Sequence, residues 1–121
     1  MATQVLNQNG LDRAAAIILS DIDYCGVGTG TTDAAIAQTQ LVAETARNAV
    51  TTEIRDSNVL QSRTFFLNSQ LPSPDVKEAG WFMNASAAAN NGSLICRSQF
   101  SFTKGTQDLL LILELTVQED T

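Results

Sequence analysis

The chain has 121 residues, of which 17% are charged, and its formal net charge is −6. A length of this order predicts one domain covering residues 1–121. Seven basic residues leave no cationic patch for nucleic acid, and no apolar run approaches the roughly 20 residues that span a bilayer. The start of the chain lacks the pattern of a signal peptide, so we expect synthesis and folding in a cytoplasm.

The N-terminal part predicts an extended arm, a short helix and a strand. Residues 1–9 are expected to form the arm, and the sequence leaves open whether it reaches a neighbour. The run of Ala, Leu and Ile over 11–19 predicts a helix with Asn9 as its N-cap. Residues 22–27 alternate in the manner of a strand.

From residue 28 onward, loops and strands alternate. Residues 28–33 are loop material, and 34–47 are expected to be a loop with at most one or two helical turns. Turn residues and prolines then separate stretches of β character, which are expected at 49–55, 59–67, 76–83, 94–103 and 109–118. The chain is therefore predicted to be mainly β, as an antiparallel β-sandwich or small barrel with one short N-terminal helix.

The last predicted strand is apolar on both faces. Its odd-numbered positions from Leu109 to Val117 form one apolar face, and Leu110 and Ile112 make the other face apolar as well. Such a strand is either central in a sandwich or covered by a partner. We expect it to anchor the core, because each large apolar side chain contributes about 1.5–3 kcal/mol on full burial.

The residue inventory argues against catalysis. The chain has no His, which excludes a Ser-His-Asp or Cys-His arrangement and removes the usual zinc ligand. Asp21 and Asp23 are expected on one side of a strand edge, as solvated carboxylates and not as a metal or acid–base pair. The glycines of 26–30 follow a strand as in a dinucleotide-binding loop, but Thr31 stands where the third glycine of that motif belongs. We therefore predict that the chain is not an enzyme and has no cofactor and no metal.

Two cysteines, Cys25 and Cys96, lie in separate predicted strands. They are expected to be buried free thiols in a reducing compartment. A disulfide would require that their strands be neighbours, which the sequence leaves open.

Several short pieces, each weak alone, follow one another in a definite order along nearly the whole chain. They are the Asn-Gly and helix of 9–19, the strand leading into 28–32, then Leu41, Glu44 and Arg47, then 78–82, and finally 96–100 before Thr103 and Lys104. In this order the chain resembles a family of small tailed-bacteriophage particle proteins and tail-fibre collar modules. The family usually has leucine where this chain has Trp81. The resemblance implies a β-sandwich module of the virion that has no catalytic activity.

The expected role is structural, and the expected location is the phage virion. Because the chain ends shortly after its last strand, we expect a capsid decoration (cement) protein that binds across subunits of the major capsid protein. Copies are expected to form a homo-oligomer, in particular a trimer. The alternative is a connector of the neck, tail or baseplate, or a tail-fibre base module. A carbohydrate- or receptor-binding module is a further alternative, which the few aromatic residues disfavour.

The candidate site residues have structural or interface roles and fall into three groups. Glycines are expected to set the backbone shape, and aromatic residues to be anchors in the core or in an interface. The charged residues are expected to form ion pairs if they are buried, Glu44 with Arg47 at the i, i+3 spacing of a helix and Glu78 with Arg97 from two predicted strands. The candidates are Gly28, Gly30 and Gly80, then Glu44, Arg47, Glu78 and Arg97, and then Phe66, Trp81 and Phe82.

Overall fold

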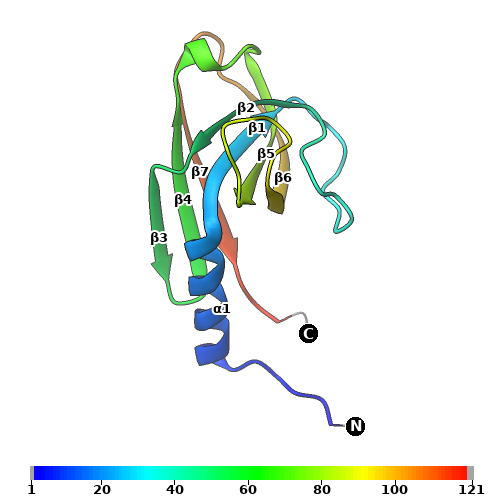
Figure 1. The fold of residues 1–121 in the computed structure, drawn as a ribbon, viewed down its shortest axis with the longest axis vertical. Coiled ribbons are helices and arrows are strands. Elements are labelled where there is room, and N and C mark those ends of the chain that lie inside the picture. The colour runs from blue at the N-terminus through cyan, green and yellow to red at the C-terminus, as the bar shows by residue number, and fades with distance from the viewer. Residues whose placement is uncertain (1, 120–121) are drawn as a thin grey trace.

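The computed structural model describes residues 2–119 and contains two antiparallel sheets packed face to face, with one N-terminal helix at the lower end that runs directly into the first strand (Figure 1). The four-stranded sheet has the order β2 (Glu44–Ala49), β1 (Ile22–Gly28), β5 (Asp75–Met83), β6 (Ser93–Thr103). The three-stranded sheet has the order β3 (Thr52–Asp56), β4 (Val59–Phe66), β7 (Leu109–Thr116). The predicted mainly-β fold with one N-terminal helix is confirmed, and of the two predicted architectures the sandwich is the one observed.

The helix α1 (Gln8–Asp21) starts earlier than predicted, so residues 8 and 9 of the expected 1–9 arm belong to the helix, and residue 1 lies outside the described range. Its N-cap is Asn7, whose side chain accepts a hydrogen bond of 3.0 Å from the N–H of Gly10. The prediction of Asn9 as the cap was wrong, because the Asn-Gly pair was interpreted as a turn and lies inside the first turn of the helix. Leu6 packs over this turn, where a Cβ at Gly10 would lie only 2.8 Å from its side chain.

The chain crosses from one sheet to the other between β2 and β3. Backbone hydrogen bonds from Val50 to Asp23 and from Thr51 to Arg63 hold this corner to both sheets. The single strand predicted at 49–55 was therefore wrong, since two strands in different sheets meet there. Residues 44–47, expected to be loop or helix, belong to β2, because pairing with β1 outweighs the helix propensity of the alanines. A short 3-10 turn (Asn68–Gln70) follows β4.

The core between the sheets has two parts. One cluster of buried side chains consists of Val27, Phe66, Leu71, Val76, Ala79 and Leu109. The other lies beneath the helix and consists of Ala15, Ile22, Cys25, Leu60 and Trp81. Two small polar residues of β4, Ser62 and Thr64, are also fully buried on the inner face. The central strands β1, β4 and β5 thus supply most of the buried side chains of the two clusters.

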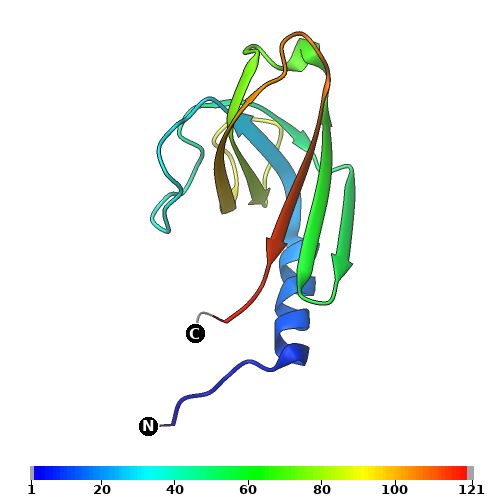
Figure 2. The same ribbon diagram turned by 180° about the vertical axis from the view of Figure 1, so that it is seen from behind.

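The side of the sandwich opposite the corner is open. There β6 and β7, joined by the connection over residues 104–108, belong to different sheets and move apart, and each pairs on one side only (Figure 2). The last strand is therefore neither central nor covered within the described chain. Its residues Leu110 and Ile112 are 54% and 49% exposed on the outer face. Leu109, Leu111, Leu113 and Leu115 of the same strand face the core side, where Leu109 is buried and the other three are half-buried.

Candidate functional site: a buried charge clamp on the four-stranded sheet

The outer face of the four-stranded sheet is covered by a long loop, residues 29–43, which we call the covering loop (Figure 1). Three glycines, two in the sheet and one in the loop, lie too close to neighbouring atoms to carry a side chain. A Cβ added at Gly28 would lie 2.2 Å from the carbonyl oxygen of Ala43, and one at Gly30 would lie 2.4 Å from a carboxylate oxygen of Glu78. One at Gly80 would lie 2.7 Å from the carbonyl oxygen of Cys96. These positions require glycine because there is no space for a side chain, which is the physical basis of their predicted backbone role.

Glu78 is the centre of the site and is 0% exposed. Its carboxylate accepts hydrogen bonds from the backbone N–H groups of Gly30 (2.7 Å), Ala43 (2.7 Å) and Val42 (2.8 Å). It also accepts one from Nε of Arg97 at 2.9 Å, which is the ion pair expected from the sequence. One side chain of β5 therefore binds both ends of the covering loop to the sheet.

Arg97 of β6 binds the middle of the same loop. Its Nη1 donates to the carbonyl oxygen of Thr32 at 2.6 Å and to Oε1 of Gln38 at 3.4 Å. Gln38 in turn accepts from the N–H of Ala35 at 3.0 Å and donates to the carbonyl oxygen of Asp33 at 3.2 Å. Glu78 and Arg97, which we call the Glu78 clamp, thus hold the loop through its backbone at several points.

A second buried ion pair lies on β2. Arg47 donates to both carboxylate oxygens of Glu44 at 2.7 Å, and its guanidinium lies 4.2 Å from the ring centroid of Phe82. Its Nη1 also donates to the carbonyl oxygens of Ser86 (3.3 Å) and Asn91 (2.8 Å). Arg47 therefore binds the 84–92 loop to the sheet as the Glu78 clamp binds the covering loop.

A β-bulge explains why two residues three apart share one face of a strand. Val27 pairs with Ala46 and Gly28 pairs with Glu44, so Thr45 is an extra residue in the ladder. In a regular strand, side chains three residues apart point to opposite faces. The extra residue places the side chains of Glu44 and Arg47 on the same face. The sequence suggested this spacing as a helical one, and the structure shows it on a bulged strand.

The three aromatic candidates are all buried within the chain. Phe66 and Trp81 lie between the two sheets, and the indole N–H of Trp81 donates to Oγ of Ser62 at 2.7 Å. Phe82 is buried on the outer face, beneath Arg47. Of the two places that the sequence left open for them, core or interface, Phe66 and Trp81 occupy the core, and Phe82 is buried within the chain on the outer face.

The two aspartates do not share a strand edge as predicted. Asp21 is the last residue of α1, and Asp23 on β1 accepts a hydrogen bond from the N–H of Ala85 at 3.1 Å. Within residues 2–119, no group of three or more acidic or cysteine side chains is placed to hold a metal ion. In the same range no helix is long and apolar enough to cross a membrane.

The environment of Glu78 shifts its ionisation. Burial alone would raise the pKa of this carboxyl group, but the guanidinium of Arg97 and the three backbone N–H groups stabilise the carboxylate more strongly. The pKa therefore lies below its ordinary value of 4.5. With four donors on its two oxygens, the carboxylate is engaged in holding the loop.

We expect the stability of the fold to decrease in acid because of this shift. A carboxyl group with a lowered pKa in the folded state stabilises the fold above its unfolded pKa, near 4.5. This contribution is lost as the pH falls below that value and through the folded pKa. Urea midpoints measured from pH 7 to pH 3 should show the loss, and Glu78→Gln should remove part of it. A variant with the same acid dependence as the wild type would contradict the assignment.

The two cysteines are not neighbours. Trp81 of β5 lies between them, since it pairs with Cys25 of β1 on one side and with Cys96 of β6 on the other. Two strand spacings place their Cα atoms about 10 Å apart, beyond the reach of a disulfide. Both are free thiols, with Cys25 buried and Cys96 half-buried.

The thiols should differ in reactivity in the folded chain. Burial raises the pKa of Cys25 to about 12 and raises that of Cys96 as well. We expect a thiol reagent at pH 8 to label Cys96 slowly and Cys25 only after unfolding, because the thiolate is the reactive form. Mass spectrometry of labelled peptides measures both rates, and the urea-unfolded chain, in which both react, is the control. Equal native rates would contradict the burial of Cys25.

The sequence did not reveal several partners of the two ion pairs. Gln38 and the carbonyl groups of Ser86 and Asn91 carry no pattern that distinguishes them from other loop residues. The glycine-rich stretch 26–30 resembles a nucleotide-binding loop in sequence. In the structure the N–H of Gly30 donates to the carboxylate of Glu78, so an internal carboxylate takes the place that a phosphate would have in such a loop. No protein-family model matches the chain, and no curated protein shows significant similarity to it.

Proposed function

We propose that the chain is a non-enzymatic structural protein of a tailed-bacteriophage particle, and that it acts as a capsid decoration (cement) protein. The observation that carries the proposal is the open side of the sandwich. Two strand edges there are unpaired within the described chain, and apolar side chains of β6 and β7 remain half-exposed beside them. A strand edge of this kind is a ready surface for pairing with another chain.

The buried charges support the same proposal. The four charged candidates are engaged in holding two loops on the outer face, through hydrogen bonds that lie inside the chain. Such clamps give rigid loops of defined shape, and a rigid surface loses little conformational entropy on binding. The chain thus presents preformed surfaces, which suits a building block.

As a decoration protein, the chain would act only by binding to other virion proteins. Copies associated with each other and bound to the major capsid protein would connect several capsid subunits at once. Each contact can then be weak, because linkage raises the effective concentration of the next contact. The low charged fraction of 17% reduces the cost of removing water from such contacts.

A cryo-EM map of the phage particle at subnanometre resolution, fitted with the two-sheet fold, tests the proposal. Density on the outer shell at positions between capsid subunits is the expected result. Density confined to the neck, tail or baseplate would replace decoration with the connector role. A particle without this chain would overturn the virion assignment.

A further inference from the structure

The N-terminal arm, residues 2–7, belongs to neither sheet. Residues 2–7 are extended and run away from the sandwich beneath α1 (Figures 1 and 2). Val5 and Leu6 are 75% and 51% exposed, and residues 2–6 carry no charged side chain. The N–H of Leu6 donates to the carboxylate of Glu119 at 2.5 Å, so the arm is held beside the C-terminal segment and not along a strand of its own chain.

The strand β7 is at the edge of the three-stranded sheet, and its outer side pairs with no strand among the described residues. Edges exposed in this way usually carry charges or proline that prevent pairing. Between Leu109 and Thr116 the only charged residue is Glu114. On the outer face Leu110 lies beside Phe65 of β4, and both are about half-exposed. On the inner face a cavity of about 420 Å³ is lined by Leu111 and Leu113 together with side chains of β6.

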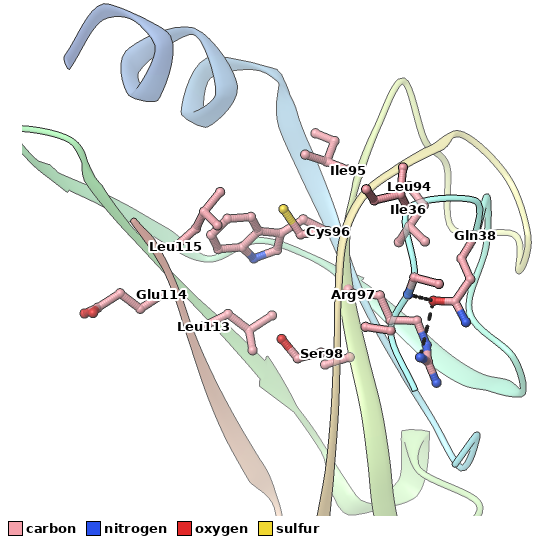
Figure 3. Close-up of a pocket in the computed structure, with 15 residues that line it drawn as sticks. Ile36, Gln38, Leu94, Ile95, Cys96, Arg97, Ser98, Leu113, Glu114 and Leu115 are labelled. Atoms are coloured by element: carbon pink, nitrogen blue, oxygen red, sulfur yellow. Dashed lines mark hydrogen bonds between the residues drawn. The ribbon is translucent and has the colours of Figure 1, made fainter. Parts of the chain in front are cut away.

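The free edge of β6 is less suited to a strand. A second cavity, of about 520 Å³, lies along this edge and has the covering loop as one wall. Figure 3 shows Ile36, Gln38 and Arg97 on one side of β6, and Leu113 and Leu115 of β7 on the other. The covering loop therefore overhangs the edge of β6, whereas the edge of β7 has no such neighbour among the described residues.

We propose that residues 2–6 of one copy pair as an added strand with the free edge of β7 in a second copy, and that this strand addition drives self-association. Consecutive residues of an extended chain point to opposite faces. Val5 and Leu6 therefore need apolar neighbours on both faces, and β7 provides them through Leu110 and Ile112 outside and Leu111 inside. An uncharged arm also approaches Glu114 without repulsion.

The lengths agree, and the contact can close a ring. At about 3.4 Å per residue, residues 2–6 of the arm span about 17 Å, and the eight residues of β7 span about 27 Å. The two partners lie at different places on each copy, so the contact is heterologous and closes into a ring when the rotation permits, including the trimer expected from the sequence. This inference rests on the self-association in the proposed function, but not on the place of the protein in a particle.

Sedimentation velocity over a series of concentrations tests the strand addition in solution. We expect the full chain to associate. Deletion of residues 2–6, which keeps the cap Asn7, should weaken the association at least tenfold, and Ile112→Lys should do the same. Combining the two changes should weaken it little further, because both remove one contact. Ile54→Lys is the matched control, since Ile54 is 43% exposed on the same outer face but lies on β3, at the far edge.

Disulfide trapping identifies the partners directly. Copies with Val5→Cys are mixed with copies of different mass that carry Leu110→Cys or Ile112→Cys, all with Cys96→Ser. Mixed dimers are expected with these edge positions and not with Ile54→Cys. A wild-type chain that is monomeric at every concentration would overturn the strand addition, and so would association that survives the deletion unchanged. Either result leaves the particle map free to decide the virion role.

Discussion

Replacing Glu78 by alanine is expected to lower the free energy of unfolding by about 3–5 kcal/mol, the usual cost of removing one partner of a buried ion pair. The change leaves the guanidinium of Arg97 buried without its counter-charge. It also removes the acceptor of three backbone N–H groups, those of Gly30, Val42 and Ala43. Each buried donor without a partner has its own desolvation cost, so the loss should lie in the upper part of this range.

Urea unfolding followed by far-UV circular dichroism measures this loss. Glu114→Ala is the matched control, because Glu114 is an exposed glutamate on β7 and its removal should change stability by no more than about 0.5 kcal/mol. Hydrogen exchange should show faster exchange at the three amides of the covering loop in Glu78→Ala. The double variant Glu78→Ala with Arg97→Met should be more stable than the sum of the single losses predicts, because no unpaired charge remains. A loss below 1 kcal/mol would mean that the clamp contributes little to the fold.

The strands were predictable because their side chains alternate. The boundaries of β4, β5 and β6 follow from the alternation and from the turn residues between them. The partner of each strand was not predictable, because alternation shows which face is apolar and not which strand lies beside it. This is why β2 and β3, which flank the corner at residues 50–51, were interpreted as one strand. It is also why the sequence left open whether the last strand is central or covered by a partner, and the structure places it at an edge.

The clamp was predictable only in part. The types and order of Glu78 and Arg97 suggested an ion pair, and the structure contains it. The three backbone donors on Glu78 were not predictable, since any loop residue other than proline can offer an N–H group. The pair of Glu44 and Arg47 was suggested by a helical spacing, and it forms because a bulge at Thr45 restores that spacing on a strand. A bulge depends on pairing with β1 and leaves no distinct pattern in β2 alone.

Replacing Trp81 by alanine is expected to cost about 3–5 kcal/mol, the range for large aromatic side chains removed from a core. Trp81 is nearly fully buried between the sheets and contributes the largest side chain of the cluster beneath the helix. Its removal leaves a cavity next to Ala15 and Leu60, and the sheets on either side cannot both collapse into it. Because the chain has one Trp, unfolding of this variant must be followed by circular dichroism and not by tryptophan fluorescence.

A second variant separates packing from the hydrogen bond. Trp81→Phe keeps an aromatic ring but leaves the hydroxyl of the buried Ser62 without its donor, so we expect a smaller loss of about 1–3 kcal/mol. Adding Ser62→Ala should recover part of it, because both polar partners are then absent. If Trp81→Ala retained near-wild-type stability but weakened self-association, Trp81 would have to contact a second copy. The two sheets would then have to separate to expose it. Its position between Cys25 and Cys96, in the middle of the sheet, predicts the opposite result.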